Sequence, residues 1–225
     1  MVNTLPVKQS HVKQLHVKQL QVKQPPVKQV SAKPYIDTRQ QILDTAREII
    51  LGKGFAAVGL NEILTSANVP KGSFYHYFKS KEQFGNALLE DYFDKYAQHL
   101  DAIFTGQGSS VTQLMHFFNN WLNSQTGEII ADKCLVVKLS AEVTDLSEEM
   151  RLTLKNGTEN VIKHIEICID EGIANKELPG HLNAADITQQ IYAMWIGATL
   201  LTKVHHNRAG LDSAMRATKR LLSIE

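Results

Sequence analysis

A short segment, Pro70 to Phe78, places hydroxyl, imidazole and ammonium groups close together at helical spacing. Phe74 and Phe78 are four residues apart, so in a helix they share a face that we expect to be buried. Polar groups on the other faces would suit phosphate oxygens and base edges in the major groove of DNA. An ordinary small helical core with a polar surface would also show this pattern. The exposed candidates are Lys71, Ser73, Tyr75 and His76, with Lys79 and Lys81 just beyond the helix.

Cysteine offers a second kind of chemistry, because a thiolate attacks electrophiles and can be oxidised. Cys134 stands at the start of an apolar stretch where a helix could begin, and a helix N-terminus stabilises a thiolate. Lys138 follows four residues later and could share its helical face. Cys134 could instead be a small buried residue, since free cysteine is among the most buried residue types. Cys168 lies among isoleucines, and we expect it to belong to the core.

Aromatic residues of the C-terminal half could line a pocket for a small molecule. They recur at helical spacing, which is more typical of a plain core, because aromatic side chains dominate cores. The histidines show no spacing typical of metal ligands, so we predict neither a metal site nor a cofactor. The pocket candidates are His116, Phe117, Trp121, Tyr192 and Trp195.

The elements that must position these groups are predicted to be helices throughout. From Asp37 onward apolar residues recur every three or four positions, and no convincing β-alternation is present. The predicted order is three small helices, a connecting helix over residues 82–104, and about five more helices. The second and third helices are separated by a turn of three to four residues, which is typical of a helix-turn-helix. The predicted fold class is therefore all-α.

Local signals mark the ends of the first helices. Asp37 or Thr38 can cap the first helix, and Gly52 and Gly54 end it. Asn68 ends the second helix, at a position where a left-handed residue is required. A proline two residues later opens the third helix with its φ already set.

Residues 1–36 differ from the rest of the chain. They carry six lysines and no acidic residue, and Val-Lys-Gln recurs five times with a five-residue period. This period keeps no helical face apolar, and prolines break any helix, so we expect a disordered arm. The arm could grip DNA phosphates, or it could be a translated short DNA repeat or the result of a start site placed too early.

Composition narrows the class of protein. A chain of 225 residues can bury a proper core, and its net charge of +1 creates no strong overall field. No apolar run is long enough for a membrane span, and the N-terminus lacks the apolar middle of a signal peptide. Two cysteines make a poor disulfide framework, so we expect a cytoplasmic protein. A phosphate-binding glycine loop, a zinc-ligand helix motif and a nucleophile elbow are all missing, so we predict no enzyme.

From Thr38 to Leu88 the sequence resembles the TetR family of bacterial repressors. The stretches that carry the resemblance are Arg-Gln-Gln-Ile-Leu-Asp-Thr-Ala (39–46), Gly-Phe (54–55) and Pro-Lys-Gly-Ser-Phe-Tyr-His-Tyr-Phe-Lys-Ser-Lys-Glu (70–82). The resemblance implies a homodimer with a DNA-binding domain over residues 37–84 and a regulatory and dimerisation domain over residues 85–225. Its last two helices would pack against those of the partner. Operator DNA would be contacted by Lys71, Gly72, Ser73, Tyr75, His76, Lys81 and Tyr77, the last of which could instead serve packing.

The C-terminal half resembles the subgroup of that family that contains the N-ethylmaleimide reductase repressor. The resemblance lies in Cys-Leu-Val-Val-Lys-Leu-Ser-Ala-Glu-Val-Thr-Asp-Leu-Ser-Glu-Glu-Met-Arg (134–151), in Tyr-Ala-Met-Trp-Ile-Gly-Ala (192–198) and in Lys203. It implies a repressor that an electrophile or oxidant releases from its operator, with Cys134 as sensor thiol and Lys203 as its partner. The alternative is a repressor released by a non-covalent small molecule, with a structural Cys134. A non-specific nucleic-acid binder and an enzyme are remoter alternatives.

Overall fold

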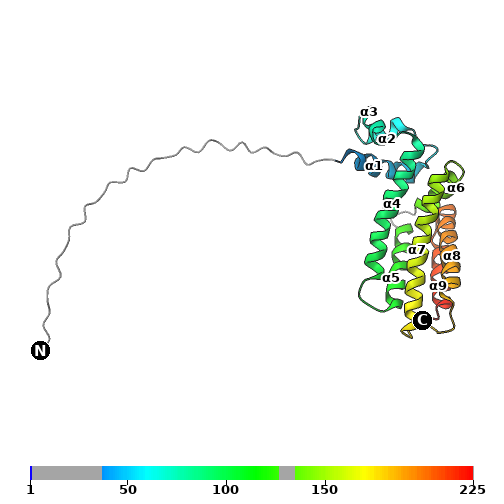
Figure 1. Cartoon of the computed structure of the whole chain (residues 1–225). Coiled ribbons are helices and arrows are strands. Elements are labelled where there is room, and N and C mark those ends of the chain that lie inside the picture. Colours follow the sequence, from blue (N-terminus) through cyan, green and yellow to red (C-terminus); the bar gives the residue numbers. More distant parts are fainter. Residues whose placement is uncertain (2–36, 127–134, 225) are drawn as a thin grey trace. The chain divides into compact units, whose positions relative to one another are not determined.

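The computed structural model describes residues 37–126 and 135–224, and Met1. The segment Ile36–Glu225 is one compact unit, and its described part consists of nine α-helices without a strand (Figure 1). The all-α prediction is confirmed. The predicted arm, residues 1–36, lies outside the described residues except for Met1. The helices are α1 (Thr38–Lys53), α2 (Leu60–Ser66), α3 (Lys71–Tyr77), α4 (Lys81–Phe104), α5 (Ser110–Thr126), α6 (Leu135–Val143), α7 (Glu148–Ala174), α8 (Ala184–His205) and α9 (Ala209–Leu221).

Helix α1 begins at a polar cap and ends at a glycine. The Asp37 carboxylate accepts hydrogen bonds from the main-chain N–H groups of Arg39 and Gln40, at 3.0 and 3.3 Å. Gly54 ends the helix with a φ of 93°, a conformation that favours glycine. Gly52 lies inside α1, so the prediction that it also ends the helix is wrong. The two ends of α1, at Asp37 and at Gly54, still follow from the residue types at these positions.

The turn between α2 and α3 depends on Asn68. Its φ is 53°, the left-handed conformation expected at this position. The next residue, Val69, donates its N–H to the Leu64 carbonyl at 2.9 Å and closes the end of α2. Gln41 of α1 donates its side-chain amide to the Ala67 carbonyl at 2.7 Å. This contact fixes the turn, and with it the start of α3, against α1.

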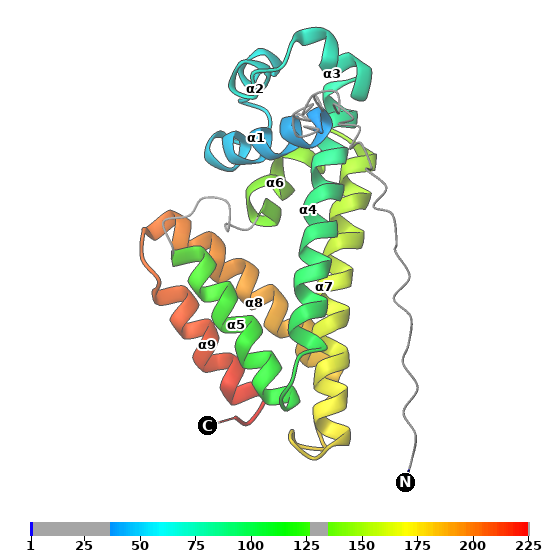
Figure 2. The same ribbon diagram turned by 90° about the vertical axis from the view of Figure 1, so that its left-hand side faces the viewer.

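Two clusters of buried apolar residues hold the helices together. The first joins α1–α3 and the start of α4 to the first turns of α7 and to α6, which contributes Leu135, Leu139 and Val143. The second joins the rest of α4 to α5, α7, α8 and α9, and includes Phe118 and Trp195 with ring centroids 5.0 Å apart. Figure 2 shows α6 next to both α1 and α4. Helix α6 therefore shares one core with the helix-turn-helix.

The long helices α4 and α7 run side by side and join these two clusters (Figures 1 and 2). Gly157 of α7 lies so close to the ring of Phe93 that a Cβ atom would overlap it. The buried amide of Asn86 donates to Glu149 at 3.1 Å and accepts from Thr153 at 2.7 Å. The predicted domain boundary after residue 84 falls inside α4 and stays a prediction. Among the described helices, none is both long and apolar enough for a membrane crossing.

Candidate nucleic-acid interface

Helix α3 presents one buried and one exposed face. It begins directly after Pro70, whose φ is −60°. Phe74 is 0% exposed and packs against Phe78 and Phe84, with ring centroids 5.1 and 5.4 Å away. This confirms that the two phenylalanines four residues apart share the inward face. The outward face therefore belongs to the polar residues of the segment.

Most of the predicted DNA contacts lie on this outward face. Lys71, Gly72 and His76 are exposed, and Ser73 is half-buried. Tyr75 is 54% exposed, and Tyr77 is 37% exposed. Tyr77 packs its ring edge-on against that of His76, with centroids 4.8 Å apart. The helix thus carries hydroxyl, imidazole and ammonium groups on one accessible surface, which we call the α3 surface. It consists of Lys71, Gly72, Ser73, Tyr75, His76 and Tyr77.

The start of α4 adds two cations beside the α3 surface. The Ser80 hydroxyl caps α4 by accepting the N–H of Gln83 at 3.1 Å. Lys79 is exposed just before this cap. Lys81 is half-buried, and its ammonium lies 5.0 Å from the centroid of the Phe55 ring. This cation–π contact fixes the position of Lys81, which spacing along the sequence could not predict.

Arg39 is a further cation near α3. It lies in the first turn of α1, and its guanidinium carbon is 5.6 Å from the centroid of the Phe78 ring. The sequence indicates Arg39 only as part of the stretch 39–46 that resembles the TetR family. Its contact with Phe78 could not be predicted, because the two residues are distant in the chain. Its charge adds to those of Lys71 and Lys79 at this end of the fold.

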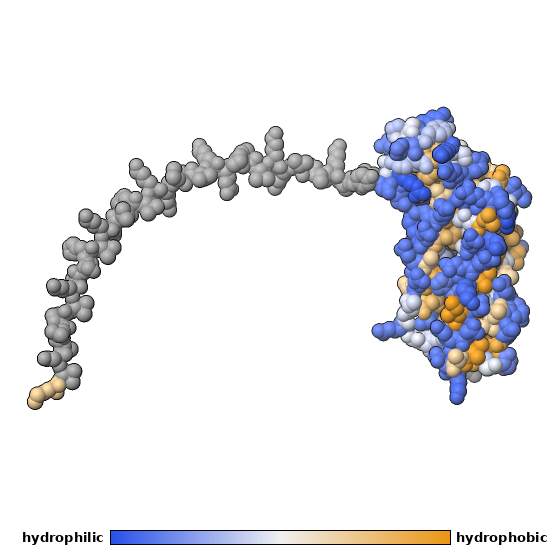
Figure 3. Space-filling view, in the orientation of Figure 1, coloured by the Kyte–Doolittle hydropathy of each residue, from blue (hydrophilic) through white to orange (hydrophobic). Residues whose placement is uncertain are grey.

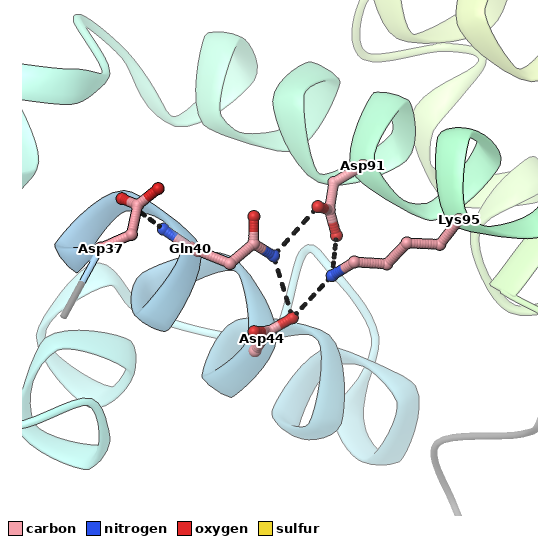
Figure 4. Close-up of polar contacts among 5 residues, drawn as sticks. All are labelled: Asp37, Gln40, Asp44, Asp91 and Lys95. Atoms are coloured by element: carbon pink, nitrogen blue, oxygen red, sulfur yellow. Dashed lines mark hydrogen bonds and ion pairs between the residues drawn. The ribbon is translucent and has the colours of Figure 1, made fainter. Parts of the chain in front are cut away.

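A polar network fastens α1 to α4 (Figure 4). The Gln40 amide donates to Asp44 at 3.1 Å and to Asp91 at 3.0 Å, and the Lys95 ammonium donates to both carboxylates at 2.9 Å. Partial burial opposes charge on Asp44, but hydrogen bonds from Lys95 and Gln40 outweigh it and lower the pKa of Asp44. Burial likewise opposes charge on Lys95, yet its bonds to Asp91 and Asp44 raise its pKa. Both groups therefore stay charged at neutral pH.

The candidate sensor is only partly covered by the structure. Cys134 lies outside the described residues, whereas Lys138 on α6 and Lys203 on α8 are both half-buried. Cys168 is 2% exposed, and burial raises the pKa of its thiol to about 12. Such a thiol forms almost no thiolate at neutral pH. The expectation that Cys168 belongs to the core is therefore confirmed.

The aromatic pocket candidates divide into a cluster and one surface residue. Trp121 and Trp195 are buried, with ring centroids 5.5 Å apart, and Tyr192 lies 5.7 Å from Trp121. The indole N–H of Trp121 donates to Thr199 at 3.0 Å, and that of Trp195 donates to Thr218 at 2.9 Å. Phe117 is also buried and lies 5.8 Å from Trp121, whereas His116 is exposed on α5. A pocket at this cluster stays a prediction.

Helix α8 exposes an apolar stripe. Leu200, Leu201 and Val204 are 51%, 49% and 62% exposed, and Gly197 lies one turn earlier. A Cβ atom added at Gly197 would meet nothing within 4 Å. On the face drawn in Figure 3, hydrophobic residues also surface over the helical body, whereas the end carrying α1–α3 is mainly hydrophilic. Contiguous exposed apolar residues of this kind are typical of interfaces.

Known proteins match both halves of the chain. Residues 42–88 match the model of the bacterial regulatory proteins of the tetR family, and residues 110–218 match the tetracyclin repressor-like C-terminal domain. The HTH-type transcriptional repressor NemR of Escherichia coli is 37% identical over 83% of this chain and 94% of its own length. The chain belongs to the tetR family of bacterial regulatory proteins.

Other tetR-family comparisons agree in sequence and in fold. The transcriptional regulator AcuR of Cereibacter sphaeroides is 31% identical over 79% of this chain and 81% of its own. The crystal structure of the reduced form of E. coli NemR superposes with a TM-score of 0.77 and 38% identity, over 82% of this chain and 96% of that one. The family match over residues 42–88 runs from the second turn of α1 to the first turns of α4, and so includes the α3 surface.

Proposed function

We propose that this chain is a transcriptional repressor that binds double-stranded operator DNA as a homodimer and leaves it when an electrophile, an oxidant or another small molecule reaches the helical body. The α3 surface is the observation that carries this proposal. It places hydrogen-bonding groups for phosphates and base edges on an α-helix, an element that the major groove of DNA can accommodate. The relatives reported above are named as regulators rather than enzymes, which supports a binding function.

His76 is the residue through which we propose to test base reading. His76→Ala should reduce the discrimination between the operator and variants with one altered base pair by about 5- to 150-fold, since a good base contact contributes about 1–3 kcal/mol. Lys79→Ala should instead weaken binding to all sequences evenly and lower the salt slope by about one, as expected for a phosphate contact. Mobility-shift titrations at several salt concentrations measure both effects. Unchanged discrimination in the His76 variant would argue against base reading by α3.

The dimer is proposed to form through α8 and α9. The α8 stripe of Gly197, Leu200, Leu201 and Val204 is the most continuous apolar surface on these two helices. Helix α9 packs closely against α8 at Gly210, where a Cβ atom would lie 3.4 Å from the Ala198 carbonyl oxygen. The α8 stripe therefore offers an apolar surface to a second copy, and a twofold axis would bring the same stripe of both copies together. Two copies would present α3 to two half-sites of an operator.

The sensor is proposed to act through Cys134 and Lys203. Leu135, which follows Cys134 in the chain, is fully buried at the start of α6, and α6 packs against α8. On α8, Thr199 accepts the indole N–H of Trp121, and Lys203 lies one turn further along the same side. From the packing of α6 against α8 we infer that the Lys203 ammonium would lie near the start of α6, where it would favour the thiolate of Cys134.

The Cys134 thiolate would react with an electrophile such as N-ethylmaleimide by addition. Its sulfur would form a bond to one alkene carbon while the other alkene carbon takes a proton from water. The bulk added next to α6 would favour a conformation whose two α3 helices no longer fit the half-site spacing.

Cys134→Ser should therefore keep operator binding and lose release by N-ethylmaleimide. Cys168→Ala is the matched control, because Cys168 is buried and its raised thiol pKa makes it unreactive. This control should release DNA like the wild type. A mobility shift with and without the reagent measures the outcome. Release of the Cys134 variant at the wild-type reagent concentration would reject the thiol mechanism and favour a repressor released by a non-covalent small molecule.

A further inference from the structure

One polar contact ties α6 directly to the loop after α1. The main-chain N–H of Ala56 donates to the Glu142 carboxylate at 3.0 Å, although the two residues lie 86 positions apart in the chain. The other oxygen of that carboxylate occupies the space beside Gly54, since a Cβ atom there would lie 2.5 Å from it. The contact is a charge-assisted hydrogen bond to the main chain of the turn that follows α1.

The chain is built locally to accept this carboxylate. Gly54 has a φ of 93°, which turns the loop and leaves no side chain in the way of Glu142. Glu142 lies in the last turn of α6, between Leu139 and Val143, which are both fully buried in the core shared with α1–α3. A shift of α6 therefore moves the Glu142 carboxylate with it. It either carries the loop along or breaks the hydrogen bond.

We propose that Glu142 is a positioning residue that transmits the position of α6 to the helix-turn-helix through the Ala56 N–H. Movement of α6 changes the pull on the loop at the end of α1, and thereby the angle at which the α3 surface is presented. This inference rests on the proposed function, because it assigns a route from the α6 region to the DNA-binding helices. It predicts reciprocity: DNA bound at α3 must also change the stability of α6.

A second polar link differs in its role. The network of Gln40, Asp44, Asp91 and Lys95 joins α1 to α4, so it holds parts of the DNA-binding end to each other (Figure 4). The Glu142 contact joins that end to α6 instead. Loss of the first link should therefore alter operator affinity itself. Loss of the second should leave the affinity within about threefold and reduce communication with α6.

Hydrogen–deuterium exchange of the full chain, free and bound to operator DNA, tests the inference. In the free protein, Glu142→Ala should speed exchange of the Ala56 amide at least about fivefold, because its acceptor is gone. Operator DNA should slow exchange in α3 and in α6 of the wild type. In Glu142→Ala it should slow exchange in α3 as in the wild type, and in α6 clearly less than in the wild type, because the shared apolar core remains. Glu142→Gln keeps an acceptor oxygen and should retain most of the effect on α6.

Glu148→Ala is the matched control, because this exposed carboxylate on α7 pairs with Arg151 of the same helix. It should behave like the wild type. If α6 of Glu142→Ala slows as much as wild-type α6, or if wild-type α3 slows while wild-type α6 does not, the inference is overturned and the proposed function stands. If operator DNA slows exchange nowhere in the wild type, the proposed function fails, and the inference falls with it.

Discussion

Replacing Leu201 and Val204 together by glutamate should convert the protein into monomers and lower its affinity for a two-half-site operator by about 100- to 10,000-fold. Both side chains are about half or more exposed on the α8 stripe, so the folded chain alone does not need them. In a dimer, four carboxylates would meet across the twofold axis without partners. Loss of the second half-site contact removes the gain from binding both sites at once, which sets the size of the effect.

Analytical ultracentrifugation measures the oligomeric state, and a mobility shift measures the affinity. Asn156→Glu adds a carboxylate at an exposed position of α7 and serves as the control, with no expected change in either property. The thermal unfolding of the double variant at low concentration should resemble that of dilute wild type. A double variant that remains dimeric and binds the operator fully would place the interface elsewhere.

Phe74→Ala should lower the free energy of unfolding by about 3–5 kcal/mol, the usual cost of removing a fully buried phenylalanine ring. The ring is 0% exposed and contacts both Phe78 and Phe84, so its loss leaves a cavity at the junction of α3 and α4. Operator binding should be lost with it, because α3 no longer has a fixed position. Urea unfolding followed by circular dichroism gives the stability change.

The neighbouring Tyr75→Ala provides the matched control for that change. Tyr75 is 54% exposed, so its loss should cost less than about 1 kcal/mol of stability while still weakening DNA binding. The two variants separate the effect of core packing from the effect of DNA contact, although the two residues are adjacent in the chain. A Phe74 variant as stable as the Tyr75 variant would contradict the packing described for α3.

Features that arise within a few residues of each other were predictable from the sequence. The spacing of Phe74 and Phe78 gives the inward face of α3, and the Asp37 cap and the left-handed Asn68 follow from residue types with known local preferences. The order of helices follows from apolar periodicity in the same way. Gly52 is the exception: it is exposed inside the last turn of α1, and the helix continues through it to Lys53.

Contacts between distant segments were not predictable. Nothing in the local pattern indicates that α6 shares a core with the helix-turn-helix, or that Glu142 accepts the N–H of Ala56. The positions of Arg39 over Phe78 and of Lys81 over Phe55 likewise depend on how helices cross. The sensor role of Cys134, outside the described residues, comes from resemblance and stays a proposal.

A hydroxyl-radical footprint of the full chain on DNA from upstream of its own coding sequence tests operator binding by a symmetric pair of α3 helices. We expect two equivalent protected half-sites, related by a twofold axis and separated by a whole number of helical turns of about 34 Å each. Protection should survive moderate salt and disappear when Lys71 and His76 are both replaced by alanine. A single unsymmetrical patch, or protection that ignores sequence and survives the double replacement, would contradict this binding mode.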